Sequence, residues 1–321
     1  MMTRLGRVAF DWVSQGNPWT NVYGFSRSLI ALATAMTLAF NDASVFFRPA
    51  AGILTYPNRG ALPGIFNMVP ASYTYLNVVR WVCVVILLLV ASGWRPRITC
   101  VLHWWISYSL FTSAITIDGG EQVATVMTLL LLPIALTDNR KWHWQTPADT
   151  LTIRNDEVLR RIVAYVTLTA IRVQVAIIYF NSTVAKLAQP EWIDGTAVYY
   201  YLNDPMLGLP SLLKNALNPI LTSSAVVIPT WGTLILQTCL FAALFAPKST
   251  WKYFLRAALL FHESIALMLG LVSFSLIMVA SLVLFLHPAE KPFLWPDRFW
   301  SLLLRRTNLI FRRSEHAESS M

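Results

Sequence analysis

The chain has 321 residues, of which 56% are hydrophobic and 13% charged, and its formal net charge is +9. Soluble domains carry roughly a quarter charged residues, so this composition excludes an ordinary soluble enzyme or binding domain. On a soluble protein the positive charge would suit nucleic acid. On a membrane protein it is typical of cytoplasmic loops, so no nucleic-acid partner is expected.

Long apolar runs fill most of the chain, and a bilayer core needs about 20 apolar residues per helix. The sequence therefore predicts an all-α integral membrane protein, a polytopic bundle of about eight transmembrane helices. Pro133 is expected to kink or end the fourth segment. The run Tyr253–Leu286 is too long for one crossing, so we divide it near Gly270. The expected segments are Tyr23–Phe40, Leu76–Ser92, Ile98–Ile115, Gln122–Leu136, Ile162–Phe180, Val226–Ala246, Tyr253–Leu269 and Leu271–Leu286.

Lysine and arginine are distributed unequally over the connections between these segments. Most of them fall on one side, in the N-terminal segment, the even-numbered connections and the C-terminal tail. The opposite side receives Arg48, Arg59, Lys186 and Lys214. Because cytoplasmic loops collect basic residues, this asymmetry predicts a multi-pass protein in the lipid bilayer with both termini in the cytoplasm.

The topology predicts three parts. Residues 1–22 form a cytoplasmic N-terminal segment, residues 23–288 the transmembrane domain, and residues 289–321 a cytoplasmic tail. The tail alternates aromatic and basic residues, which favours an amphipathic helix on the anionic inner leaflet. Within the domain, residues 182–225 are expected outside, as short interfacial pieces or re-entrant turns, because Pro, Gly and Asn interrupt their apolar residues.

Two arginines, Arg27 and Arg172, lie inside predicted membrane segments. Ionisable groups at this depth are costly and often functional. One interpretation is structural, an ion pair or a clamp on backbone carbonyls inside the bundle. The other is a site that binds an anionic or quinone-like group.

Lys186 follows the fifth segment and is surrounded by the apolar residues of TVAKLAQ. An amine in apolar surroundings can lose its proton near neutral pH and act as a general base. The alternative is a lysine whose stem lies along apolar surface while its ammonium reaches the lipid headgroups.

Other polar residues stand at the start of the fourth segment and within the seventh. Asp118 and Glu121, in TIDGGEQ, can cap a helix or form part of a site. His262 is expected either in the core or in the site. A zinc-protease motif would need a second histidine at position 266, which is Ala266, so no metal site is predicted. The cysteines, none in a CxxC pair, are expected to be small buried hydrophobes: Cys83, Cys100 and Cys239.

Several strings in the chain resemble a known family. NPWTNVYGFSRSLIALAT, DGGEQVATVMTLLLLPIALTD and FHESIALMLGLVSF are similar to the HTTM domain, the membrane domain shared with vitamin K-dependent gamma-glutamyl carboxylases. The most specific match is KLAQPEWIDG, in which Lys186 precedes Trp192 by six residues and Gly195 by nine. Within that superfamily, GWRPRITCVLHWWISYSLFTSAITIDGGEQVATV resembles the SdpB (sporulation-delaying protein B) family of the bacterial cell membrane.

This resemblance implies a function. SdpB-like proteins act with an SdpA-like partner to produce or mature a secreted SdpC-like peptide toxin. The carboxylase likeness implies that Lys186 is a catalytic base and that a reduced quinone is a possible cofactor. Glu121 and His262 are then further catalytic candidates, with Asp118, Arg27, Arg172, Trp192 and Gly195 as substrate-binding candidates.

Two departures from the carboxylases argue against glutamate carboxylation. Glu121 stands at about the place of a carboxylase histidine, and the large lumenal domain that binds the carboxylase substrate has no counterpart in the chain. Three alternatives remain open: a quinone-dependent redox or carboxylase-like enzyme, a non-catalytic scaffold or export subunit, and an immunity protein.

Overall fold

The computed structural model describes residues 10, 12–14, 16–49, 55–146 and 155–293. These residues form helices and no strand, apart from one isolated bridge between Trp94 and Trp142. Contacts divide the chain after Lys291, and every helix below belongs to the first part. The predicted tail, from residue 294 onward, and most of the first 15 residues lie outside the described residues.

Within the described part of the chain, five helices are long and apolar enough to cross a membrane, which confirms a membrane-type helical bundle. They are α2 (Asn21–Phe40), α4 (Tyr73–Ser92), α6 (Gly119–Thr137), α7 (Asn155–Leu187) and α11 (Val227–Ala242), the last extended by flanking 3₁₀ turns η2 (Ser224–Val226) and η3 (Ala243–Phe245). The other elements are α3 (Ala43–Phe46), η1 (Ile65–Met68), α5 (Pro96–Ser113), α8 (Pro190–Ile193), α9 (Ala197–Asn203), α10 (Ser211–Leu221), α12 (Trp251–Leu269) and α13 (Val272–Leu286).

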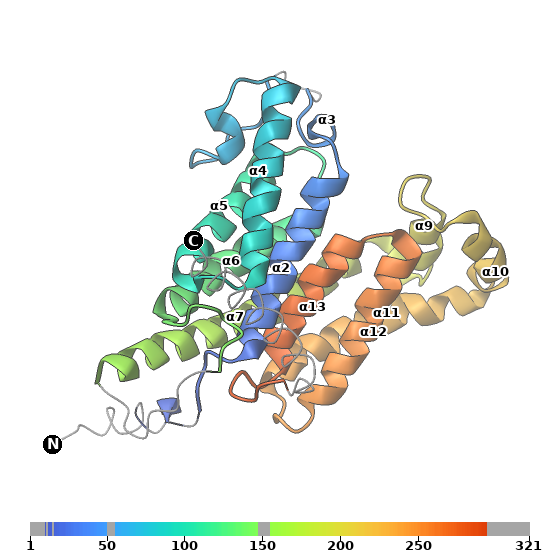
Figure 1. The fold of residues 1–321 in the computed structure, drawn as a ribbon. Helices are drawn as coiled ribbons and strands as arrows, with labels where there is room; N and C mark the ends of the chain where they lie inside the picture. Colours follow the sequence, from blue (N-terminus) through green and yellow to red (C-terminus); the bar gives the residue numbers. More distant parts are fainter. Residues whose placement is uncertain (1–9, 11, 15, 50–54, 147–154, 294–321) are drawn as a thin grey trace, which may run out of the picture. The chain divides into compact units, whose positions relative to one another are not determined.

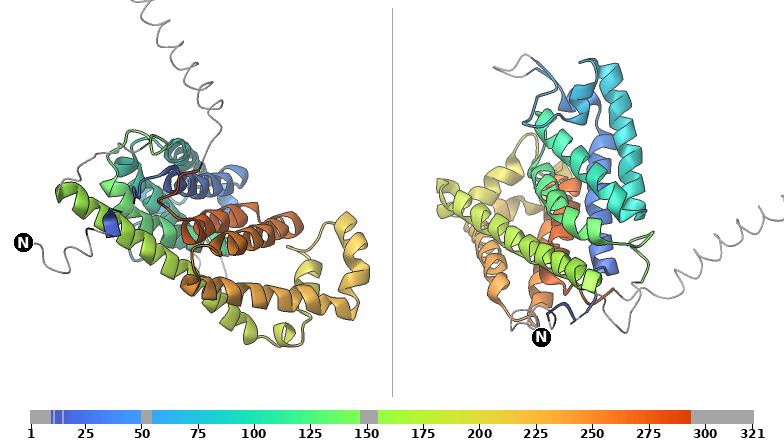
Figure 2. Two further views of the ribbon diagram at one scale, coloured as in Figure 1. Left: turned by 90° about the horizontal axis from the view of Figure 1, so that it is seen from below. Right: turned by 90° about the vertical axis from the view of Figure 1, so that its left-hand side faces the viewer.

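The long helices pack in two rows. In one row α4 packs on α2, α2 on α13, and α13 on α12 (Figure 1). In the other, α5 packs on α6, α6 on α7, and α7 on α11. Helix α13 also contacts α6 and α7, so it joins the rows, and α7 crosses the bundle obliquely (Figure 2). Contact between α11 and α12 is much sparser than along the rows, and this opening positions the candidate site.

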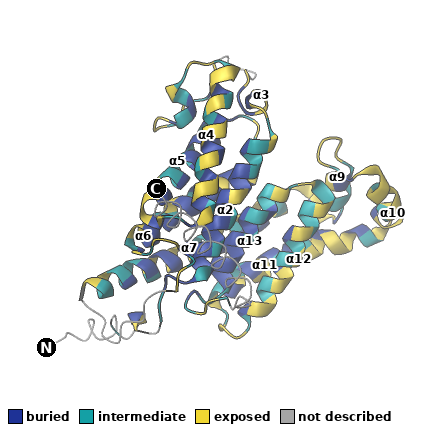
Figure 3. Cartoon of the chain, viewed as in Figure 1, coloured by how far each residue is buried: buried dark blue, intermediate teal, exposed yellow. Residues whose placement is uncertain are grey.

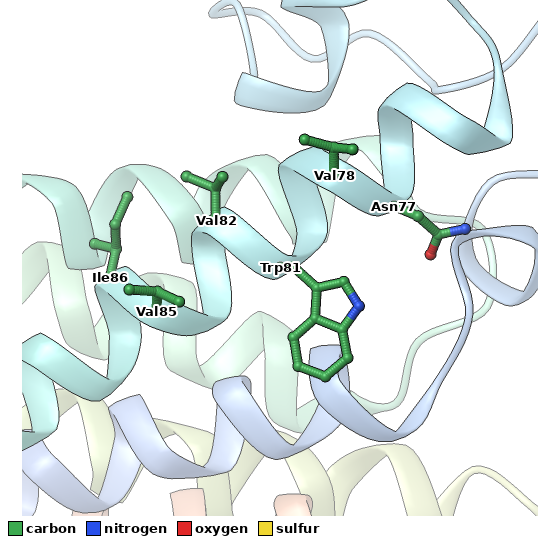
Figure 4. Close-up of a pocket in the computed structure, with 6 residues that line it drawn as sticks. All are labelled: Asn77, Val78, Trp81, Val82, Val85 and Ile86. Atoms are coloured by element: carbon green, nitrogen blue, oxygen red, sulfur yellow. The ribbon is translucent and has the colours of Figure 1, made fainter.

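The apolar surface is turned outward as well as inward. Figure 3 shows buried residues along α2 and α13, whereas much of α4 is exposed. Val78, Trp81, Val82 and Val85 project from one face of α4, around a shallow apolar hollow (Figure 4). A helix that presents such a face to its surroundings is typical of contact with lipid tails. Cys239 is exposed on α11, so the prediction that every cysteine is buried is wrong for that residue.

Two predicted breaks have different outcomes. The division near Gly270 is confirmed, because α12 ends at Leu269 and α13 begins at Val272, with Gly270 in the left-handed region at φ +71°. Pro133 does not end its helix, since α6 continues to Thr137. Pro133 lacks an N–H and leaves the Leu129 carbonyl one turn earlier without its helical partner, a loss that neighbouring groups in a bundle can offset. In the last turn of α6, Trp19 Nε1 donates to the Ile134 carbonyl (3.2 Å).

Helix α7 is longer than predicted at both ends, Asn155–Leu187 instead of Ile162–Phe180. Its first turns include an ion pair one turn apart, with Arg161 Nη2 2.6 Å from Glu157 Oε1. At the other end, Lys186 lies in the last turn of the helix and not beyond it. Hydropathy predicted too short a helix here, because polar residues at both ends extend α7 beyond its apolar middle.

The Gly93 turn between α4 and α5 gives a first prediction. Gly93 has φ +89°, and a Cβ atom there would lie 2.5 Å from the His143 ring. Gly93→Ala is therefore expected to lower the free energy of unfolding by at least about 1–2 kcal/mol, the cost of left-handed backbone, plus the clash. Thermal unfolding of the purified protein measures this. Gly232→Ala, with open space around its Cβ, is the control and should not destabilise.

Candidate functional site

A cavity of about 560 Å³ lies where α11 and α12 separate, and it is also lined by residues from the end of α7, from α8 and α9, and from the start of α13. Its walls are mainly apolar. The polar side chains among them include Lys186, His262, Gln237 and Ser182. An apolar pocket with a few convergent polar groups is the usual form of a binding site.

Lys186 is held by two neighbours. Its Nζ donates to Ser182 Oγ (2.6 Å), one turn earlier on α7, and lies 5.3 Å from the centre of the Trp192 ring. Trp192 is buried on the short helix α8. A cation over an indole face is favourable. The Lys186 ammonium is thus half-buried at the cavity wall, and no carboxylate pairs with it among the described residues.

Gly195, three residues after Trp192, does not line the cavity. Its φ of +87° lets the chain turn from α8 into α9, and a Cβ there would lie 2.8 Å from Val227 Cγ2. The spacing between Lys186, Trp192 and Gly195 therefore has a structural cause. Lys186 carries the amine, Trp192 supports it, and Gly195 brings the connection between α8 and α9 close to α11.

His262, on α12, lines the opposite wall of the cavity. Its Nε2 is 2.9 Å from the hydroxyl of Tyr179 on α7. Its Nδ1 is buried and makes no hydrogen bond to a described residue, and the same is true of Gln237 Oε1. Buried polar atoms are normally paired. A ligand in this cavity could therefore supply polar groups to both.

The three catalytic candidates, Lys186, Glu121 and His262, do not all line the same cavity. The structure brings Lys186 and His262 to one cavity, whereas Glu121 does not line it. Glu121 lies on α6, where its Oε1 accepts from Thr37 (3.0 Å), and Asp118 caps the same helix by accepting from the Gly120 amide (2.6 Å). Phe274 stands between the two places, since its ring is 5.7 Å from that of His262 and its backbone packs on Gly120.

The two arginines predicted inside membrane segments lie outside both places. Arg27 is 1% exposed and donates to Thr99 Oγ1 (2.6 Å) and to the Val90 carbonyl (3.4 Å), so it clamps α2 to α4 and α5. Arg172 stacks on Trp251, with Cζ 4.4 Å from the ring centre. Neither arginine lines the cavity, and the observed contacts match the structural interpretation of Arg27.

Sequence reasoning missed three polar residues in or beside the site, Tyr179, Ser182 and Gln237. Tyr179 and Ser182 stand seven and four residues before Lys186, so they share one face of α7 with it, and that spacing was a usable signal. Gln237 had no such signal, because only the packing of α11 against α7 and α12 decides which way it faces.

Two proteins of Bacillus subtilis (strain 168) match nearly the whole chain. "Uncharacterized protein YitO" is 51% identical over 291 residues, 91% of this chain and 93% of that protein. Sporulation-delaying protein SdpB is 38% identical over 280 residues, 87% of this chain and 85% of SdpB. The chain belongs to the SdpB family. No family model and no solved structure match it, so the likeness of this SdpB-family protein to the HTTM domain stays a prediction.

The cluster around Arg27 predicts a pH dependence. His143, in the connection after α6, has its Nδ1 3.4 Å from Arg27 Nη1, and burial holds the pKa of His143 well below its usual range. The unfolded chain, with a histidine pKa near 6.5, then binds more protons than the native protein at lower pH. The free energy of unfolding should therefore fall as the pH drops from about 7 to about 5. Denaturation at several pH values tests this, and His143→Gln should reduce the slope.

Proposed function

We propose that this SdpB-family protein is a membrane factor for the production or maturation of a secreted SdpC-like peptide toxin and acts with an SdpA-like partner. Its similarity to sporulation-delaying protein SdpB over 87% of the chain carries the proposal. In support, the structure forms an apolar cavity with a half-buried amine at its wall, a place where a peptide segment could be held.

We propose further that the chain crosses the membrane eight times, through α2, α4, α5, α6, α7, α11, α12 and α13. Contacts between helix ends support an alternating course. Near one end, Thr37 of α2 meets Glu121 at the start of α6. Near the other, Thr20 before α2 donates to the Ala289 carbonyl after α13 (2.6 Å). With both termini cytoplasmic, the Lys186 cavity opens at the external end, where a secreted peptide would be handled.

Reporter fusions test this topology. A periplasm-type or extracellular reporter is expected to be active when fused after Leu269, and a cytoplasmic reporter when fused after Pro288, because α13 returns the chain across the bilayer. Fusions in the connection after Thr137 should report the cytoplasm. An extracellular signal from the fusion after Pro288 would contradict the eight crossings.

A second candidate function is a quinone-dependent redox or carboxylase-like enzyme. The apolar walls of the cavity and the unpaired polar atoms of His262 and Gln237 favour it, since they fit a flat apolar group with polar edges. Lys186 and His262 would hold a reduced quinone, and the quinone would supply reducing equivalents when bound. The chain's own contribution there would be an amine that can accept a proton at Nζ.

The toxin proposal can be tested in cells that carry the precursor and the SdpA-like partner. Mass spectrometry of the secreted peptide is expected to show the mature form only when this chain is present. Gly232→Trp, which fills the cavity, should strongly reduce maturation. Ile235→Trp, exposed on the same helix but outside the cavity, is the matched control.

The outcomes separate the alternatives. A mature peptide of unchanged mass and amount without the chain contradicts the proposal. If the peptide is chemically unchanged but remains inside the cell, the export alternative replaces it. If only the survival of the cells changes, the immunity alternative replaces the proposal.

A further inference from the structure

A second group of buried polar side chains lies away from the Lys186 cavity, where α2, α5 and α6 meet. Helix α5 contributes Thr99, His103 and Ser107, each four residues from the next and each at most 2% exposed. Because side chains four residues apart lie on one face of a helix, these residues form a stripe about 12 Å long. The stripe faces the interior of the bundle and not its lipid-facing side.

The neighbouring helices extend the stripe at both ends. At one end, Arg27 of α2 donates to Thr99 Oγ1 (2.6 Å). At the other, Thr125 of α6 donates to the Ser107 carbonyl (3.0 Å) and to the carbonyl of Glu121, one turn earlier (2.8 Å). The polar groups thus follow one another from Glu121 to Arg27. We call this set, with Thr34 and Thr37 of α2, the polar column.

Many polar atoms of the column lack a hydrogen bond to any described residue although they are fully buried. The unpaired atoms are Arg27 Nε, Thr34 Oγ1, His103 Nε2, Ser107 Oγ and Glu121 Oε2. Buried polar groups in proteins are paired with protein or with ordered water, and an ordered water typically makes two to four such bonds. Unpaired donors and acceptors on three facing helices therefore point to water as their shared partner.

Glu121 is the titratable group at the outer end of the column. It is 2% exposed, its Oε1 accepts from the Thr37 hydroxyl, and it forms no ion pair among the described residues. A buried carboxylate with no cation beside it is strongly disfavoured, so the carboxyl carries a proton. Asp118, at the N-cap of the same helix and partly exposed, is the charged neighbour of Glu121.

We propose that ordered water fills the polar column and that the neutral carboxyl of Glu121 exchanges its proton with the outer aqueous phase through Asp118. The exchange is balanced, because the proton that leaves Glu121 is replaced from water. At the other end the fixed cation of Arg27 repels a proton, as an arginine does in water-selective pores. The column is therefore a proton-binding site open to one side of the membrane, not a channel through it.

The reactivity of introduced cysteines tests whether water fills the polar column. In a background without native cysteines (Cys83→Ala, Cys100→Ala, Cys239→Ala), Thr34→Cys and Ser107→Cys are expected to react with a small charged thiosulfonate reagent added outside intact cells. Thr128→Cys on α6 is the control, because Thr128 is equally buried but its hydroxyl is paired with the Ala124 carbonyl (2.7 Å). Reaction no faster at positions 34 and 107 than at 128 would overturn the proposal.

Infrared spectroscopy of the purified full chain in nanodiscs tests whether Glu121 carries an exchangeable proton. The wild type is expected to show a carboxylic-acid C=O band that shifts on transfer to D₂O, and Glu121→Gln should lose that band. Asp118→Leu should retain the band but slow its shift. A spectrum of Glu121→Gln that keeps the exchanging band would overturn the assignment. Both readouts require only folded protein, which a monodisperse elution profile establishes for each variant.

Discussion

Replacing Lys186 by alanine is expected to reduce formation of the mature peptide by at least about 100-fold, the usual effect of removing a general base. Nζ of Lys186 is the only amine at the cavity wall among the described lining residues, and it is held by Ser182 and Trp192. The variant should accumulate normally, since Lys186 makes no ion pair within the described structure. Mass spectrometry of the secreted peptide and immunoblotting of membranes measure both quantities.

Two further variants show what the amine does. Lys186→Arg keeps the positive charge but cannot give up its proton, so it stays inactive if Lys186 is a base and recovers activity if Lys186 only attracts a charged group. Lys214→Ala, on α10 and outside the cavity, is the matched control and should behave as the wild type. Full maturation by Lys186→Ala would remove Lys186 from the site.

Replacing Arg27 by methionine is expected to lower the free energy of unfolding by about 2–4 kcal/mol, because a charge-assisted hydrogen bond is lost and its buried partners remain unpaired. Arg27 joins α2 to Thr99 at the start of α5 and to the Val90 carbonyl at the end of α4. These contacts hold α2, the end of α4 and the start of α5 together. Unfolding of the purified protein by heat and by added denaturing detergent measures the loss.

The controls for Arg27 separate charge from geometry. Arg27→Lys keeps the charge but lacks the planar fork that reaches Thr99 and the Val90 carbonyl together, so an intermediate loss is expected. Arg256→Met removes an exposed arginine of α12 and should change stability by no more than about 0.5 kcal/mol. Wild-type stability of Arg27→Met would show that the clamp is not needed.

The sequence indicated only the local part of the candidate site. Lys186 and Trp192 are close in sequence and in contact, and the turn at Gly195 follows three residues after Trp192. His262 joins them from a distant helix. Glu121 does not, because Phe274 of α13 packs between it and His262. Which distant side chains share a cavity depends on helix rotation, and apolar periodicity is a weak guide when helices are apolar on all sides.

Length, hydropathy and local backbone preference were enough to predict a helical membrane bundle and the division of one long apolar run at Gly270. Residue strings indicated the resemblance to the SdpB family. The separation of α11 and α12 around a cavity, and the polar column between α2, α5 and α6, depend on tertiary packing. Lipid tails are as apolar as leucine, so in a membrane hydropathy does not select which helices pack together. Close packing and buried polar contacts make that choice.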